Sequence, residues 1–191
     1  MPSTTTPHPT QREIEPHPSP PQDPKTHKPS YAPNPSTSVP LSPTRQAIQT
    51  HILNLYSGAA SESDMAVYAE QAVYDDPLSY CDTRYKIAGQ WYGIPNLFAR
   101  SETLATEVVV NSEDELVWKQ RQRYTLAGVH VSKTVDSLVS LRLEHQNAGE
   151  KVVYHKDMWD EEDYDHGGFG AWIKKVNGDL LTHITKPPES I

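Results

Sequence analysis

The spacing of apolar residues changes near residue 105, and the change divides the folded part of the chain into helices followed by strands. From Pro43 to Gly58, apolar side chains recur at helical spacing, and Ser42 stands where a helix cap is expected. This pattern predicts a first helix, whose inward residues are Ala47, Ile48, Ile52, Leu55 and Tyr56.

Two more helices and a short strand are expected before the period changes. A second helix begins after Ser61 or Ser63 and ends near Gln71, and residues 72–76 then form a strand that Pro77 terminates. A loop follows. Pro95 is placed for the first turn of a third helix, which would bury Leu97, Phe98 and Leu104.

Four alternating runs rich in β-branched and aromatic residues come next, which is typical of successive antiparallel strands. They cover residues 105–110, 115–126, 134–145 and 151–160. Asn147 and Gly149 lie where the last two strands would turn back. Pairing His145 with Lys151 then places Leu143 opposite Val153, Leu141 opposite His155, Val139 opposite Asp157 and Ser137 opposite Trp159.

The apolar ladder of this hairpin indicates which face is buried. Val139, Leu141 and Leu143 share one face of the earlier strand, so that face should point inward. His155 and Asp157 then point inward too, and a polar pair on an apolar concave face is what a ligand pocket requires. The outer face would hold Val152, Tyr154 and Met158, and the inward residues of the strand 115–126 would be Trp118, Gln120, Gln122 and Tyr124.

Proline marks the boundary of the folded part. Thirteen of the 17 prolines lie within residues 1–43, where apolar side chains are too few to offset the entropy of ordering. We therefore expect a disordered tail over 1–43 and one domain over 44–191, with a helical extension from about residue 169. The PxxP spacings at Pro18, Pro21 and Pro24 would give the tail weak polyproline interactions.

Charge and cysteine content exclude several classes of protein. The formal net charge is -8, which argues against nucleic acid as a partner. No segment is long enough to cross a bilayer, and no signal-peptide core is present. Cys81 is the only cysteine, so an intramolecular disulfide is impossible, and a cytoplasmic location is expected.

The order of the expected elements resembles the nuclear transport factor 2-like (SnoaL-like) superfamily over residues 44–165: helices, a short strand ending in Asp-Pro, a helix, then long antiparallel strands. The resemblance implies an α+β cone, in which N-terminal helices pack on a strongly curved, mainly antiparallel sheet. In ketosteroid isomerase of this superfamily, the second acid of a V-E-D-P strand is the general base. The matching string here is Val73-Tyr74-Asp75-Asp76-Pro77, so the resemblance assigns the base to Asp76.

Inward positions of the final strand line the active site in that family, and they fall here on His155, Asp157 and Trp159. The family's oxyanion hole uses a tyrosine of the first helix and a protonated aspartate of the penultimate strand. The corresponding positions here are His51 or Ile52 and Val139, so steroid isomerisation itself is not implied.

Our first functional hypothesis is a cofactor-independent isomerase, cyclase or dehydratase that acts on a small, mostly apolar carbonyl compound. Asp76 would take a proton, and His155, oriented by Asp157, would deliver one. No sharply spaced ligand motif predicts a metal. The substrate would be held by Tyr74, Trp118, Gln120, Gln122, Tyr124, Val139, Leu141 and Trp159.

A second hypothesis is a non-catalytic module that binds a small ligand or a protein. Its cone would be filled by its own side chains, and its outer face, with Val152, Tyr154 and Met158 beside Leu138, would form a homodimer or bind a partner. Asp76 also has a plainer interpretation, as a turn residue whose carboxylate accepts local backbone donors.

Overall fold

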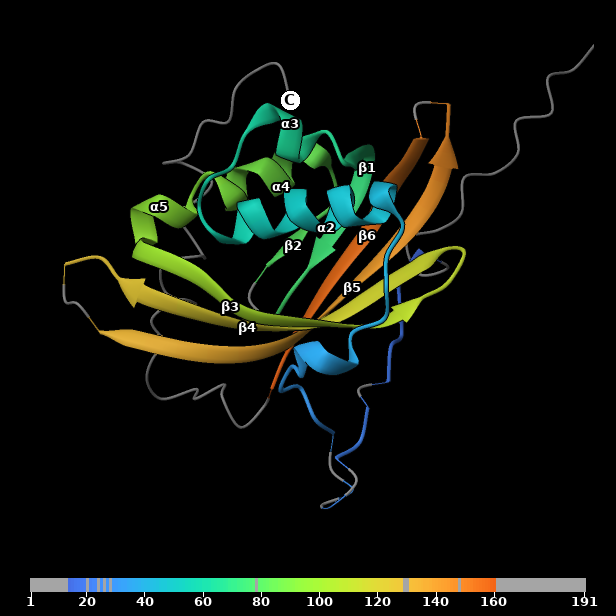
Figure 1. The fold of residues 1–191 in the computed structure, drawn as a ribbon. Helices are drawn as coiled ribbons and strands as arrows, with labels where there is room; N and C mark the ends of the chain where they lie inside the picture. The colour runs from blue at the N-terminus through green and yellow to red at the C-terminus, as the bar shows by residue number, and fades with distance from the viewer. Residues whose placement is uncertain are drawn as a thin grey trace, which may run out of the picture.

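Among the described residues, six strands form one strongly curved sheet, and helices cover its concave face (Figure 1). The structure, a computed structural model, describes residues 14–19, 21–23, 25, 27, 29–77, 79–128, 131–147 and 149–160. The strand order is β2-β1-β6-β5-β4-β3. All neighbouring strands are antiparallel except β1 and β6, which are parallel. The predicted α+β cone is confirmed.

The strands agree with the expected runs except at their ends and at Tyr80–Cys81, where the sequence predicted a loop. The third expected helix does not reach Leu104, because only Ile94–Leu97 is helical and the chain then pairs with the next strand from Phe98 onward. Leu104 is exposed on that strand. The strands are β1 (Tyr68–Asp75), β2 (Tyr80–Cys81), β3 (Phe98–Asn111), β4 (Glu115–Leu126), β5 (Ser132–Gln146) and β6 (Gly149–Trp159).

The helices are set by local caps and by the side chains that they bury. Ser42 caps the first helix by accepting the Arg45 backbone N–H, as its position predicts. The second is shorter than expected, because β1 pairing already begins at Tyr68. A helix capped by Thr83 replaces the loop expected before residue 89. The helices are η1 (Pro35–Thr37), α2 (Pro43–Tyr56), α3 (Glu62–Met65), α4 (Arg84–Trp91) and α5 (Ile94–Leu97).

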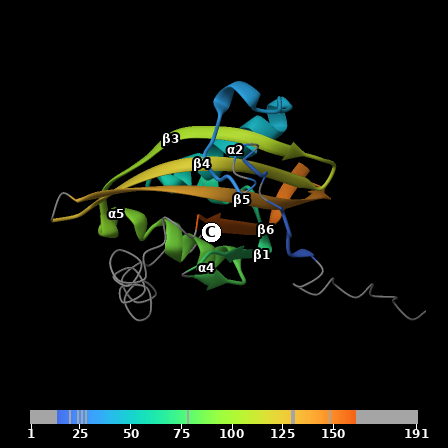
Figure 2. The same cartoon turned by 90° about the horizontal axis from the view of Figure 1, so that it is seen from below.

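Part of the proline-rich segment lies against the sheet, on the side opposite α2 (Figures 1 and 2). The Asn34 backbone N–H and the Thr37 hydroxyl both donate to the Glu107 carboxylate on β3, at 2.8 and 2.7 Å. The Val39 N–H donates to the Val108 carbonyl at 2.9 Å, which covers one end of the β3 edge. Within the described residues, the expected disordered tail thus makes specific contacts. The predicted boundary at residue 43 stays a prediction, and the helical extension from residue 169 lies outside the described residues.

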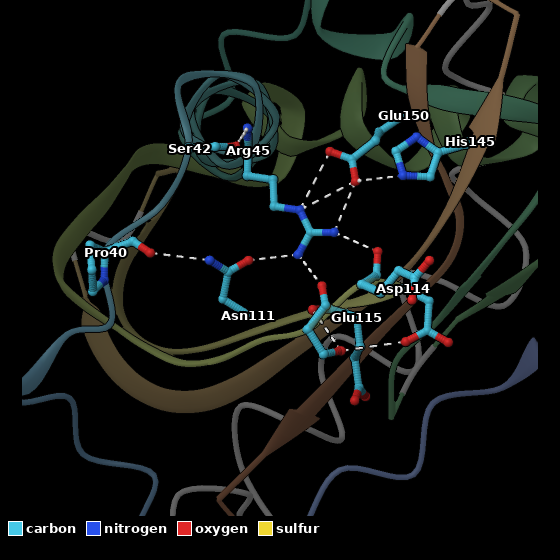
Figure 3. A network of polar contacts seen from close by, with 10 residues as sticks. Pro40, Ser42, Arg45, Asn111, Asp114, Glu115, His145 and Glu150 are labelled. Atoms are coloured by element: carbon cyan, nitrogen blue, oxygen red, sulfur yellow. Dashed lines mark hydrogen bonds and ion pairs between the residues drawn. The ribbon is translucent and has the colours of Figure 1, made fainter.

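A buried arginine ties α2 to both distal turns of the sheet (Figure 3). The Arg45 guanidinium forms an ion pair with Glu150 at 2.9 Å and donates to the Asn111 side chain at 2.6 Å. It also donates to the carbonyl oxygens of Ser112 and Glu113. Because both charged side chains are about nine-tenths buried, this network fixes the helix over the ends of β3 and β6.

The hairpin of β5 and β6 has the predicted register only on one side of a bulge. Leu141 pairs with His155, Val139 with Asp157 and Ser137 with Trp159, as expected. Near the turn, however, Leu143 pairs with Val152 and His145 with Glu150, because Gln146 pairs directly with Gly149 and a β-bulge absorbs the extra residue. Val152 therefore belongs to the buried core beside Leu143, and not to the outer face.

The outer face proposed for a partner is largely covered. Leu138 and Tyr154 are buried within this single chain, and the Tyr154 hydroxyl donates to Asp75 at 3.2 Å. Glu15 forms an ion pair with Lys156 on the same face. Homodimerisation stays a prediction, but this face no longer supplies an apolar surface for it. Within the described residues, no helix combines the length and hydropathy needed to span a bilayer.

Candidate functional site

The concave face brings together the residues that strand alternation predicts to point inward. They come from β4, β5 and β6 and form continuous cross-strand rows, such as Trp118, Val139 and Asp157. The buried inward residues are Trp118, Gln120, Gln122, Tyr124, Val139, Leu141, His155 and Asp157, and Trp159 is half-buried.

His155 lies at the centre of an aromatic cluster and is completely inaccessible to solvent. Its Nδ1 lies 2.7 Å from the Tyr68 hydroxyl, and its Nε2 lies 3.3 Å from the Tyr56 hydroxyl. The ring also contacts Tyr74 edge-on and stacks near Trp91, with ring centroids 4.9 and 6.0 Å away. Burial lowers the pKa of His155 to about 3, so the imidazole is neutral at physiological pH.

Asp157 is the buried acid of this cluster. The Tyr56 hydroxyl donates to its Oδ2 at 2.7 Å, and the Trp159 indole N–H donates to the same oxygen at 3.2 Å. Its Oδ1 is buried and has no hydrogen-bond partner of good geometry among the described residues. Burial raises the pKa of Asp157, although the Tyr56, Trp159 and Ser137 side chains partly oppose that effect.

Tyr56 stands between His155 and Asp157, so the carboxylate orients the imidazole only indirectly, and not by the direct contact that the sequence suggested. When Asp157 is ionised it can only accept, so Tyr56 donates to it and accepts from Nε2–H of His155. Nδ1 of His155 is then left to accept from Tyr68. This assigns the Nε2–H tautomer and gives the hydrogen-bonded chain one direction, from Tyr68 to Asp157.

Asp76 has both of its carboxylate oxygens engaged. Oδ1 accepts the backbone N–H of Ser79 at 2.5 Å, and Oδ2 accepts the Tyr74 hydroxyl at 2.7 Å. The Asp76 N–H donates in turn to the Ser79 carbonyl. The structure therefore places Asp76 in a turn that ends β1, while Tyr74 links it to the aromatic cluster.

Solved structures of the same architecture decide the fold. Similar structures include a nuclear transport factor 2-like protein from Anabaena variabilis (10% identity, TM-score 0.53), with 61% of this chain and 86% of that chain covered. Another is a protein described as a SnoaL-like polyketide cyclase from Shewanella putrefaciens (13% identity, TM-score 0.53), with 64% of this chain and 83% of that chain covered. A third is a hexachlorocyclohexane dehydrochlorinase (7% identity, TM-score 0.52), with 61% of this chain and 82% of that chain covered. The chain has the nuclear transport factor 2-like fold. No family model and no curated protein matches its sequence.

Along β4, this nuclear transport factor 2-like cone carries a chain of side-chain amides that bind one another. Trp118 donates to Gln120 at 2.9 Å, and Gln120 donates to Gln122 at 3.3 Å. Gln122 donates in turn to the Ser101 hydroxyl at 2.8 Å and to the Tyr56 carbonyl. These amides, expected to position a substrate, thus also hold β4 against β3 and α2.

Tyr124 differs from the amides, because its hydroxyl makes no hydrogen bond to any described residue. It packs against Phe98, with ring centroids 4.7 Å apart. Burial, together with the nearby Asp157 and Asp76 carboxylates, raises the pKa of Tyr124 well above its usual value. The phenol therefore stays protonated and can donate to a bound molecule.

Sequence analysis missed the roles of Tyr56, Tyr68 and Trp91. Tyr56 was expected only as an inward core residue of the first helix, Tyr68 lay within the expected second helix, and Trp91 was assigned to no element. The available signal was chemical: a buried phenol normally finds a polar partner, and His155 and Asp157 were the polar residues expected inside the cone. Within the described residues, no three His, Cys, Asp or Glu side chains are grouped so as to hold a metal.

Proposed function

We propose that the chain is a cofactor-independent acid-base catalyst of the isomerase, cyclase or lyase kind, acting on a small, mostly apolar carbonyl compound. The observation that carries this proposal is Asp157, a buried carboxyl with a raised pKa, one oxygen of which accepts no hydrogen bond of good geometry from a described residue. A general base works best when its pKa lies near the working pH, and a raised pKa brings a carboxyl closer to that value. The cyclase and the dehydrochlorinase among the similar structures support such chemistry on this fold.

Asp157 takes the proton in this proposal, in place of Asp76. Both oxygens of Asp76 are held by Ser79 and Tyr74, whereas Oδ1 of Asp157, although buried, accepts no hydrogen bond of good geometry from a described residue. Tyr56 and Trp159 hold the other oxygen and so fix the direction of Oδ1.

The developing enolate needs a donor, and Tyr124 supplies it. Its hydroxyl is protonated, uncommitted to other described residues and close enough to Asp157 to be affected by its charge. A donor directed at the carbonyl oxygen stabilises charge that develops in the transition state. His155 and Tyr68 are positioning residues, since they act on Asp157 only through Tyr56.

The test measures the step that these reactions share, removal of a proton next to a carbonyl group. The full chain would be incubated in D₂O with 2-tetralone, and loss of the α-proton signal would be followed by NMR. Asp157→Asn should slow the exchange about 100-fold or more, the usual contribution of a general base. Tyr124→Phe should also slow it. The matched control, Asp76→Asn, should change the rate less than about threefold.

A rate that survives in Asp157→Asn but is lost in Asp76→Asn would overturn the assignment and restore Asp76 as the base. If the native chain exchanges 2-tetralone and related ketones no faster than acetate buffer does, the catalytic proposal fails. The non-catalytic module then becomes the better explanation, since the interior amides already bind one another and the His155 imidazole is already bonded by Tyr68.

A further inference from the structure

A hollow lies apart from the proposed base, on the side of β1 that meets the β5–β6 hairpin. Its volume is about 340 Å³, and Tyr68 is the single residue that it shares with the aromatic cluster. Ile14, Ala69 and Val153 give it an apolar wall, and its charged lining residues are Arg84, Lys151, Glu70 and Glu144. A cavity of this size lies at the lower end of the range for small-molecule sites.

Two irregularities in the sheet create this hollow. Between Tyr68 and Val73, β1 leaves its regular pairing with β6, and the residues between them include lining residues of the cavity. The bulge in the β5–β6 ladder falls beside Val153, which lines the cavity as well. Bulges are common next to functional sites because they redirect side chains. Both breaks in the ladder therefore converge on one place.

The charged groups of the lining do not neutralise one another. Glu144 stands directly opposite Lys151 in the ladder, yet Lys151 donates to the Ala66 carbonyl at 2.6 Å. Arg84 makes one long bond, 3.4 Å, to the Tyr68 carbonyl. No ion pair joins Arg84, Lys151 or Glu144 to another described residue. Two cations and two carboxylates, Glu70 and Glu144, thus lie around the cavity with hydrogen-bonding capacity left over.

We propose that this cavity binds a free α-amino acid with an apolar side chain. The carboxylate would lie between Arg84 and Lys151, the ammonium group would face Glu144, and the side chain would contact Ile14, Ala69 and Val153. A purely anionic ligand would leave the Glu70 and Glu144 carboxylates unmatched, and a purely cationic one would be repelled by Arg84 and Lys151. The site goes beyond the proposed catalytic function and uses no group that moves a proton there.

The experiment measures binding of L-leucine to the full chain by NMR titration and calorimetry. Two analogues that lack one charge, 4-methylpentanoate and 3-methylbutylamine, are titrated beside it. Saturable binding of leucine is expected, with each analogue weaker by about tenfold or more, the usual effect of losing a charged hydrogen bond. Amide shifts should be largest at Gln71, Lys151 and Val153.

Variants separate a built site from non-specific association. Arg84→Gln and Glu144→Gln should each weaken leucine binding about tenfold or more while the fold is retained, as checked by circular dichroism. Arg100→Gln is the matched control, because that arginine is exposed on β3, and it should bind as the native chain does. Asp157→Asn should also bind normally, which keeps this result separate from the catalytic one. Absence of saturable leucine binding, equal binding of all three compounds, or unchanged binding in Arg84→Gln would overturn the proposal.

Discussion

Replacing Arg45 by methionine should destabilise the domain strongly, since this side chain connects three segments that are distant in sequence. Its guanidinium contacts Glu150 on β6, Asn111 at the end of β3, and two carbonyl groups of the turn that follows (Figure 3). Methionine retains most of the apolar stem but none of the donors. The Glu150 carboxylate would then stay in a nine-tenths buried position without the guanidinium, with the exposed His145 imidazole, 3.7 Å away, as its remaining ionisable neighbour among the described residues.

The magnitude follows from the asymmetry of buried ion pairs. Removing one partner leaves an uncompensated charge, which typically costs about 3–5 kcal/mol. For a domain of this size, 1 kcal/mol shifts Tm by about 4 °C, so Arg45→Met should lower Tm by about 12–20 °C. The Tm of Arg45→Lys should fall between those of the native chain and Arg45→Met. Lysine keeps the charge but cannot reach both Glu150 and the turn carbonyls at once.

Thermal and urea unfolding, followed by circular dichroism, would measure the effect. Arg100→Met is the matched control, since this exposed arginine pairs only at the surface of β3, and it should cost less than about 1 kcal/mol. In the double variant Arg45→Met/Glu150→Met, part of the loss should be recovered, because no unpaired carboxylate remains. A loss below about 1 kcal/mol in Arg45→Met would refute the reasoning.

Three further outcomes are expected. The pKa of His155 falls to about 3 in the folded state, so its contribution to the free energy of unfolding is complete above pH about 6.5 and declines as the pH falls toward 3. In urea unfolding measured over this pH range, His155→Gln should therefore make the free energy of unfolding less dependent on pH. The raised pKa of Asp157 has the opposite sign, so Asp157→Asn should raise the free energy of unfolding at pH 8 more than at pH 4, and an equal change at both would contradict that direction. Leu141→Ala should cost about 2–5 kcal/mol in the same assay, whereas Leu104→Ala, at an exposed position, should cost less than about 0.5 kcal/mol.

The orientation of the site could be predicted from the sequence, because it depends only on the alternation of side chains between the two faces of a strand. Once Val139 and Leu141 are assigned to the core, strand pairing turns Asp157 and His155 to the same side. The bulge near Val153 could not be predicted, since it reflects how the turn at Gly149, with its φ of 103°, joins a ladder that also pairs with β1.

The partners of the polar pair were beyond sequence reasoning. Tyr56 and Asp157 are brought together by packing of the first helix across the last strand, and nothing local specifies that contact. The extended conformation at Leu104 has a similar cause, because pairing of β3 with β4 outweighs the helix signal around Pro95. Asp76 shows the reverse case, where the local turn interpretation matched the contacts that form.

The order of the strands has a consequence for how this chain folds as it is synthesised. The last strand of the described residues, β6, lies inside the sheet and joins β1–β2 to β3–β5. Until it leaves the ribosome, two half-sheets expose the edges that it will later join, and their pairing requires loops of long sequence separation to close. The nascent protein therefore depends on late assembly, and ribosome-bound fragments that stop before Gly149 should be recognised by chaperones as unfinished.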